Sequence, residues 1–270
     1  MNDRVRITVS PSGVAEVALN RPDKLNALDF AMFDALAGAI DRLKTEPGLR
    51  VVLLHGEGRA FCAGLDMERM GRIGTGDAGG TRDLRPRTHG AARTMNSAQY
   101  IAMGWRELAV PVIAAVHGVA FGGGLQVALG ADIRLASADL KMSVMEVKWG
   151  LVPDMAGIVL MRSLLRDDVV RELTYSGRVV VGEDAVRLGL ATRVSADPLA
   201  EARALADELS QRSPDALRAA KRLLNQSAAG ASDAALLQAE SDEQVALMGS
   251  PNQREAVRAN LEKRAPRFER

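Results

Sequence analysis

The sequence contains little of several residue types that mark particular classes of protein. Aromatic residues make up only 3% of the 270 residues, which argues against the stacking surfaces that bind nucleic-acid bases. The formal net charge is +1, so neither a basic stripe nor an acidic tail is indicated. A single cysteine, Cys62, excludes a disulfide within the chain and is typical of a reducing compartment. Three histidines without ligand spacing predict no metal site.

Long apolar runs are also missing. None reaches the length of a membrane span, and the opening MNDRVRITVS does not have the pattern of a signal peptide. We therefore expect a cytoplasmic protein that binds neither nucleic acid nor a membrane. Hydrophobic residues (47%) and charged residues (26%) occur at ordinary globular levels, and a chain of this length can bury one large core.

One stretch combines a buried strand, a glycine run and a helix. Val112–Val116 is apolar and β-branched, which predicts a strand, and Gly122–Gly124 precede an apolar run that predicts a helix from about residue 123 to Gly130. Unpaired N–H groups and the helix dipole would favour negative charge at that helix start. The alternative is that the glycines only let a helix pack closely on a sheet. GxGxxG is absent, which argues against a dinucleotide site.

A second element of the same kind lies upstream. GEGRAFCAGLD at 56–66 follows the apolar run 50–55 and precedes a helix-like segment that begins at Met67. Two separate amides directed at one oxygen form an oxyanion hole, which stabilises charge developing on a thioester carbonyl. Together with NRPDKLNAL at 20–28, the motifs FCAGLD at 61–66 and VAFGGGLQVALGADIRLAS at 119–137 resemble the crotonase (enoyl-CoA hydratase/isomerase) superfamily, nearly from end to end.

This resemblance implies an α/β fold made as a spiral of repeated ββα units. The core with the acyl-CoA site would cover residues 1–196, starting with a hairpin of 4–10 and 14–20. After residue 197 the spacing becomes purely helical, over 199–209, 215–224, 234–247 and 254–261. The resemblance implies that this helical region forms a homotrimer or a dimer of trimers. Coenzyme A would be part of the substrate, with no separate cofactor.

Proton transfer beside a thioester requires a carboxylate base as well as an enolate trap. Glu146 lies in the apolar SVMEV, where burial would raise its pKa, although such a residue could equally be a structural ion-pair partner. Against the family pattern Glu146 occupies the catalytic glutamate position. Asp154 falls where the similar dienoyl-CoA isomerases carry an acidic residue.

Gln126 departs from the hydratase pattern, which has a second glutamate there to hold the attacking water. A glutamine can form hydrogen bonds but cannot take a proton at neutral pH. Dienoyl-CoA isomerases carry an aspartate at this position, so the match to them is partial. We favour a double-bond isomerase in which Glu146 and Asp154 move the proton. The alternatives are an enoyl-CoA hydratase, another acyl-CoA reaction such as hydrolysis or C–C cleavage, and a non-catalytic acyl-CoA-binding homologue.

The resemblance assigns further roles by position. The oxyanion donors would be the backbone N–H groups of Leu65 and Gly123. Asp66 could contact substrate or could cap the following helix. The expected substrate-binding residues are Lys24, Ala27, Ala63, Gly64, Asp66, Gly122 and Gln126. Cys62, Trp105 and Trp149 are expected in the core rather than in a reactive role.

Residues 71–90 (GRIGTGDAGGTRDLRPRTHG) are rich in glycine and basic residues and have no apolar period. We therefore expect a mobile loop. Its four arginines could contact CoA phosphates or could simply be solvated. They are Arg72, Arg82, Arg85 and Arg87.

Overall fold

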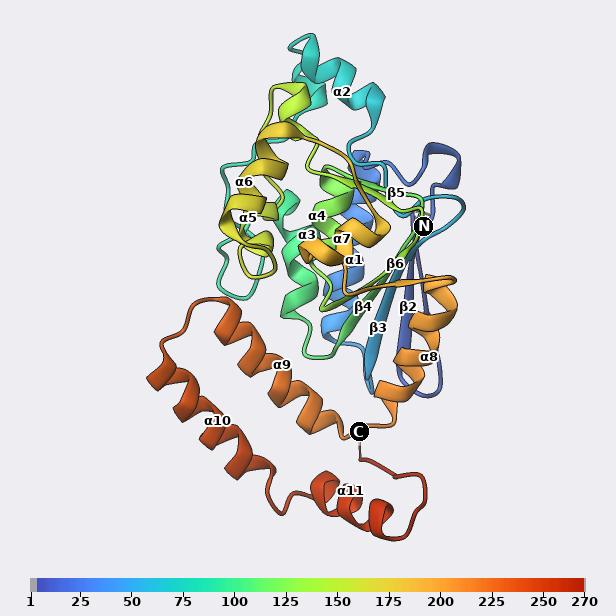
Figure 1. Ribbon diagram of the computed structural model, residues 1–270, viewed down its shortest axis with the longest axis vertical. Coiled ribbons are helices and arrows are strands. Elements are labelled where there is room, and N and C mark those ends of the chain that lie inside the picture. The colour runs from blue at the N-terminus through green and yellow to red at the C-terminus, as the bar shows by residue number, and fades with distance from the viewer. Residues whose placement is uncertain (1–3, 270) are drawn as a thin grey trace.

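The computed structural model describes residues 4–269, so the first residues of the segment considered for a signal peptide lie outside it. A six-stranded sheet with the order β1-β2-β3-β4-β6-β9 forms its centre (Figure 1). The first two strands are the predicted antiparallel hairpin, and every later neighbour in the order is parallel. The strands are β1 (Val5–Val9), β2 (Val14–Leu19), β3 (Val51–Gly56), β4 (Val112–Val116), β6 (Ile133–Ser137) and β9 (Arg193–Ser195).

A smaller sheet lies beside the first and contains β5 (Val119–Phe121), β7 (Lys141–Ser143) and β8 (Val180–Val181). The chain passes from β4 in the large sheet to β5 in the small one, and then from β6 to β7 in the same way. A helix, α4 (Gly123–Leu129), follows β5 directly and begins at the residue that the sequence predicts. This repeated step from one sheet to the other confirms the predicted α/β spiral.

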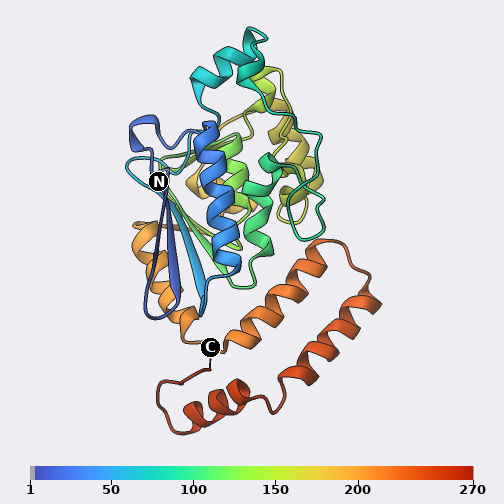
Figure 2. The ribbon, with the colours of Figure 1, turned by 180° about the vertical axis from the view of Figure 1, so that it is seen from behind.

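Both faces of the large sheet are covered, as is usual for parallel strands. Alternate residues of β3 pack into two different clusters, with Val52 and Leu54 in one and Val51 and Leu53 in the other. Helices α1 (Phe30–Lys44), α3 (Ser97–Glu107) and α4 contribute to the first cluster, and α8 (Pro198–Ser210) to the second (Figures 1 and 2). The helix α1 is capped as expected, because the side chain of Asp29 accepts a hydrogen bond from the Met32 N–H.

Of the other helices, α2 (Met67–Gly74) lies at the upper end of the molecule in Figure 1. Below it are α5 (Gly157–Met161), α6 (Asp167–Ser176) and α7 (Gly182–Leu188), which all contribute buried residues to the first cluster. Three short 3-10 turns complete the elements: η1 (Pro22–Lys24), η2 (Ala78–Gly80) and η3 (Glu146–Trp149). The segment 71–90 was expected to have no regular structure, and this is wrong in part, since it contains the end of α2 and η2.

The C-terminal helices α9 (Pro214–Ala228), α10 (Asp233–Leu247) and α11 (Pro251–Leu261) form an arm that extends away from the sheets (Figure 1). All four predicted C-terminal helices are present, but α8 packs on the sheet although it follows residue 197. The arm is anchored by Lys221, whose ammonium group lies 2.8 Å from an Asp132 carboxylate oxygen and donates to the Val110 carbonyl. Within residues 4–269 no helix is long and apolar enough to cross a membrane.

Candidate active site

Two segments that are distant in the chain are hydrogen-bonded side by side. The Cys62 N–H donates to the Val119 carbonyl at 3.0 Å, and the Phe121 N–H donates back to the Cys62 carbonyl at 3.1 Å. On its other side the same segment pairs with Leu28, whose N–H donates to the Gly64 carbonyl at 2.8 Å. A Cβ atom at Gly64 would lie 2.5 Å from the Phe121 carbonyl oxygen, and its φ is +87°, so only glycine fits there.

The glycine run at the start of α4 has two structural consequences. Close packing is one, because a Cβ atom at Gly124 would lie 2.3 Å from the carbonyl oxygen of Cys62. The other is an open helix start, since Gly122 has φ +50° and provides no side-chain cap. The N–H groups of Gly123 and Leu65 have no hydrogen-bond partner among residues 4–269, and both residues line one pocket. This arrangement is compatible with the predicted oxyanion donors.

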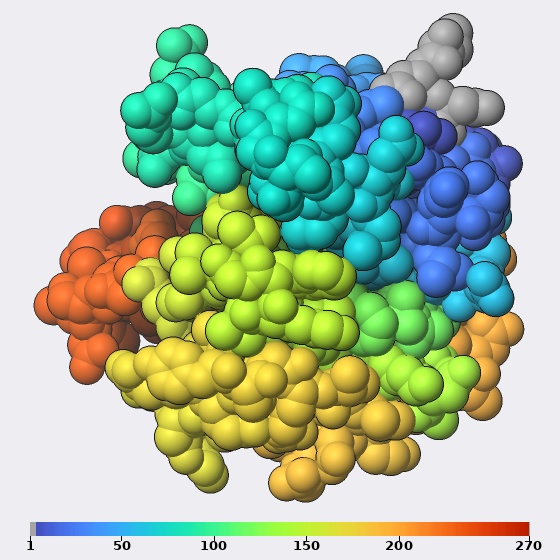
Figure 3. Space-filling view, turned by 90° about the horizontal axis from the view of Figure 1, so that it is seen from above, coloured from blue at the N-terminus to red at the C-terminus, as the bar shows by residue number. Residues whose placement is uncertain are grey.

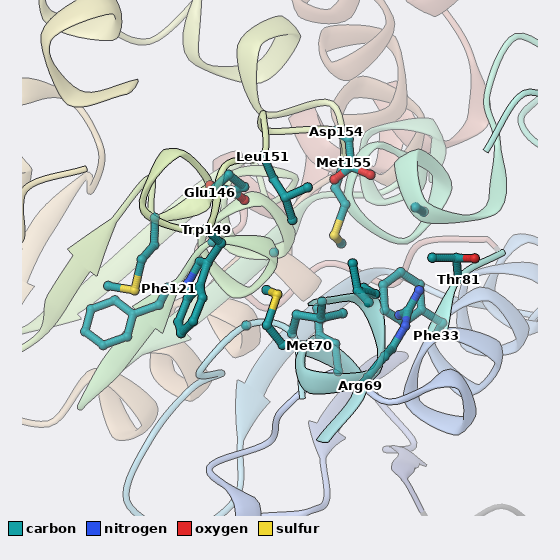
Figure 4. Close-up of a pocket in the computed structure, with 18 of the residues that line it drawn as sticks. Phe33, Arg69, Met70, Thr81, Phe121, Glu146, Trp149, Leu151, Asp154 and Met155 are labelled. Atoms are coloured by element: carbon teal, nitrogen blue, oxygen red, sulfur yellow. The ribbon is translucent and has the colours of Figure 1, made fainter. Parts of the chain in front are cut away.

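The pocket has a volume of about 400 Å³ and lies at the end of the molecule viewed in Figure 3, where the segment around α2 meets the segment that follows η3. Most of its wall is apolar. Its polar and charged side chains are Thr81, Arg69, Arg82, Glu146 and Asp154. The apolar lining includes Phe33, Met70, Ile73, Leu84, Ala98, Trp149, Leu151 and Met155 (Figure 4). Such a pocket suits an alkyl or acyl chain next to two carboxyl groups.

Gln126, only 1% exposed, is held in one orientation behind the pocket. Its Oε1 accepts hydrogen bonds from the N–H groups of Met155 (2.9 Å) and Gly157 (2.8 Å). Because both of these partners are donors, the amide oxygen must face them and the amide NH₂ must face the other way. That NH₂ donates to Oε1 of Glu146 at 2.6 Å. Gln126 therefore positions the glutamate and offers no second carboxylate beside it.

The other oxygen of Glu146 is unusual. Oε2 is buried and has no hydrogen-bond partner among the described residues. Burial raises the pKa of Glu146, and the negative charge of Asp154 raises it further, while the hydrogen bond from Gln126 opposes the shift. A carboxylate with one oxygen held and the other free is suited to accept a proton.

Asp154 is the second carboxyl group of the pocket, on the irregular segment between η3 and α5. Burial raises its pKa as well, and the nearby positive charge of Arg69 acts against that shift. Figure 4 shows Asp154 beside Met155, apart from Glu146. The two predicted carboxylates thus share one pocket but have different neighbours.

The predicted substrate-binding residues divide into two groups. Ala63, Gly64 and Gly122 line the pocket, whereas Lys24 and Ala27 do not. Gln126 contacts Glu146 from behind, and Lys24 ends the short turn η1. Asp66 caps α2, where its carboxylate accepts from the Glu68 N–H and forms an ion pair with Arg21 at 2.5 Å.

The four loop arginines all have partners within the protein. Arg72 pairs with Asp77 and Arg85 with Asp83. Arg82 forms a bidentate pair with Asp34, at 2.6 and 2.9 Å. Arg87 donates to two backbone carbonyls of its own loop. Contact with CoA phosphates stays a prediction.

Sequence reasoning missed part of the site and misplaced one residue. Trp105 is fully buried as expected, but the prediction that Trp149 lies in the core is wrong, because it is 42% exposed and lines the pocket. Its position three residues after Glu146, in the same short turn, indicates nearness to the site but not exposure. Arg69 and Met70 were also missed, because the pocket-facing side of α2 follows only from how that helix docks.

Comparison with known proteins agrees with this geometry. The model of the enoyl-CoA hydratase/isomerase family matches residues 10–270. A probable enoyl-CoA hydratase from Bacillus subtilis is 29% identical over 94% of this chain and 95% of its own. The mitochondrial Delta(3,5)-Delta(2,4)-dienoyl-CoA isomerase of Dictyostelium discoideum is 28% identical over 94% and 87%. The crystal structure of enoyl-CoA hydratase from Mycobacterium tuberculosis H37Rv superposes with a TM-score of 0.83, at 28% identity, and 99% of each chain is covered.

Proposed function

This chain belongs to the enoyl-CoA hydratase/isomerase family, and we propose that it moves a double bond along the acyl group of an acyl-CoA thioester. The family's acyl-CoA chemistry is the premise, and the arrangement of carboxyl groups in the pocket favours one reaction over the others. Both an isomerase and hydratases occur among the similar proteins, so the names alone do not make this choice.

The thioester carbonyl would lie between the N–H groups of Leu65 and Gly123. Removal of a proton from the acyl chain converts the thioester into an enolate, with negative charge on that oxygen. Two fixed donors stabilise this charge more than they stabilise the neutral carbonyl, and loss of one such donor typically costs about 3 kcal/mol of barrier.

Glu146 would take the proton through its free Oε2, and Asp154 would return a proton to a different carbon. The raised pKa of each carboxyl group, caused mainly by burial, brings it closer to neutrality, where general acid–base catalysis is most effective. The double bond would move because the enolate is delocalised over the chain before the second transfer.

The contact between Gln126 and Glu146 carries the preference for isomerisation. An amide that already donates to Glu146 and accepts from two backbone N–H groups has no free acceptor with which to orient a water molecule. The second carboxylate is at Asp154 instead, further along the same pocket. Hydration is the second candidate, favoured by the names of most relatives. A binding-only protein is less well supported, because it would retain two buried carboxyl groups at a cost in stability.

The test is isotope exchange in deuterated water with a panel of enoyl- and dienoyl-CoA thioesters, followed by mass spectrometry. We expect deuterium uptake and double-bond migration without addition of water. Glu146→Gln should lower both deuterium uptake and double-bond migration at least a hundredfold, and Asp154→Asn should lower the migration by a similar factor. Rapid hydration by the native protein would contradict the isomerase assignment, and unchanged turnover in both variants would contradict the assigned bases.

We further propose that α9–α11 form the contacts of a homotrimer or a dimer of trimers in the cytoplasm. Large apolar side chains on the arm are exposed in the single chain: Leu224, Leu237, Val245, Met248 and Leu261. Sedimentation analysis at several concentrations tests this assembly.

A further inference from the structure

Of the two arginines in the pocket wall, Arg82 forms a salt bridge and Arg69 forms none within the described residues. Arg69 lies in the first turn of α2, four residues after Leu65. In Figure 4 its side chain lies beside Phe33 and apart from Glu146 and Trp149. Arg82, the other arginine of the pocket, is fully paired with Asp34.

No salt bridge holds the Arg69 side chain, although the negative charges of Asp154 and Asp29 lie near enough to oppose the lowering of its pKa by burial. Nε donates to the Gly80 carbonyl at 3.0 Å. The guanidinium carbon lies 4.1 Å from the ring centre of Phe30 and 5.0 Å from that of Phe33. Aromatic faces attract a cation but accept no conventional hydrogen bond from it. The group is thereby fixed in direction while most of its donor capacity is unused.

Its NH1 nitrogen shows this directly, because it is buried and has no hydrogen-bond partner among residues 4–269. A buried charged donor without a partner is costly, and native proteins rarely leave one unless a ligand supplies the acceptor. A purely alkyl chain in the pocket would leave NH1 unpaired. A carboxylate would satisfy it and would match its charge.

We propose that Arg69 binds a carboxylate carried by the acyl group, so that the substrates are acyl-CoA thioesters with a second, distal acidic group. This inference rests on the acyl-CoA function proposed above and adds the class of acyl group. The distal carboxylate lies against Phe33 and Arg69, while the thioester end lies at Leu65 and Gly123. The apolar wall between them contacts the methylene groups.

Binding of saturated thioesters tests the inference apart from any reaction, because a saturated acyl group has no double bond to move or hydrate. We compare pairs of acyl-CoA thioesters of equal chain length, in which one member ends in a carboxylate and the other in a methyl group. We expect the native protein to bind the carboxylate-ended member of at least one pair more than tenfold more tightly. Equal binding across all pairs overturns the role of Arg69, whereas no binding of any thioester overturns the acyl-CoA function itself.

Variants identify the residue responsible. Arg69→Met should abolish the preference for the carboxylate while binding of the methyl-ended thioesters is retained, which also shows that the variant is folded. Arg69→Lys should keep part of the preference, because it keeps the charge but loses the planar set of donors. Arg42→Met is the control, since this arginine lies on the same helix as Phe30 but forms an ion pair with Glu46 outside the pocket, and the preference ratio should stay unchanged.

A purely structural or electrostatic role for Arg69 gives different results. If Arg69 only supports α2, Arg69→Met weakens both members of every pair by the same factor. If it only adjusts Asp154, the variant changes the pH profile of turnover for all substrates and leaves the preference ratio intact. Either result overturns the proposal.

Discussion

Replacing Gln126 by glutamate would place a carboxylate where the amide now donates to Glu146. The present nitrogen–oxygen distance is 2.6 Å. Two unit charges at that distance, with an effective dielectric constant of about 20, repel by about 6 kcal/mol. The hydrogen bond to Glu146 would also be lost, which costs about 1.5–3 kcal/mol for a charged partner. We therefore expect the two carboxyl groups of Gln126→Glu to share one proton at neutral pH.

The resulting loss of stability should depend on pH in a defined direction. Because the pair shares one proton, its second ionisation has a pKa in the folded state that is raised above the unfolded value of about 4.3. Below that pH this ionisation costs no stability. The penalty grows as the pH rises towards the folded-state pKa, because ionisation then favours the unfolded chain. Urea denaturation of the native protein and of Gln126→Glu across this range measures the difference in unfolding free energy.

Gln126→Met provides the control for this experiment. It removes two hydrogen bonds to backbone N–H groups, at about 1 kcal/mol each, and the one to Glu146, at about 1.5–3 kcal/mol, and it introduces no charge. Its loss of stability should be about 4 kcal/mol, with a much smaller pH dependence that comes from Glu146 alone. If Gln126→Glu shows a constant difference in stability at every pH, the two side chains do not face each other as described.

In turnover assays Gln126→Glu should add water faster than the native protein, and equal hydration rates would refute the proposed role of the amide.

Three further predictions concern the backbone cradle, the arm and the thiol. Gly64→Ala should abolish turnover and lower stability by about 2 kcal/mol or more, because its Cβ would collide with the Phe121 carbonyl; activity with unchanged melting would argue against this packing. Lys221→Met should lower the unfolding free energy by about 3 kcal/mol, because the carboxylate of Asp132 would keep a backbone hydrogen bond but lose its ion pair. Lys221→Arg serves as the charge-retaining comparison in the same denaturation series. Burial raises the pKa of Cys62 to about 12, so thiol reagents at about pH 8 should label it only after denaturation; prompt labelling of the native protein would show that the thiol is accessible.

Much of the framework could be predicted because it follows from local patterns. The strand at Val112–Val116 is buried on both faces and therefore reads as a continuous apolar run. The cap at Asp29 and the helix start after Gly122 depend on the residue type at one position. The approximate positions of the two strand-to-helix segments, around 56–66 and 112–130, followed from the same local signals.

The features that could not be predicted depend on contacts between distant segments. Trp149 lies in a turn of only four residues, which is too short for a periodic pattern to indicate its exposed face. Arg69 reaches the pocket because it stacks on Phe30, which belongs to a different helix. The orientation of the Gln126 amide is set by backbone donors near Met155, and no spacing in the sequence shows that they converge on it.

The strand pairing that joins residues 62–64 to β5 has a consequence for how the reaction of such a protein can change during evolution. The amides of this cradle are held by backbone atoms, which every residue carries, so most side-chain changes leave them in place. Asp154 lies instead on a segment without regular structure, where exchange of the proposed proton donor would leave the sheets undisturbed. On the proposed mechanism, an inherited framework could keep stabilising the same enolate while single codon changes nearby redirect what that enolate becomes.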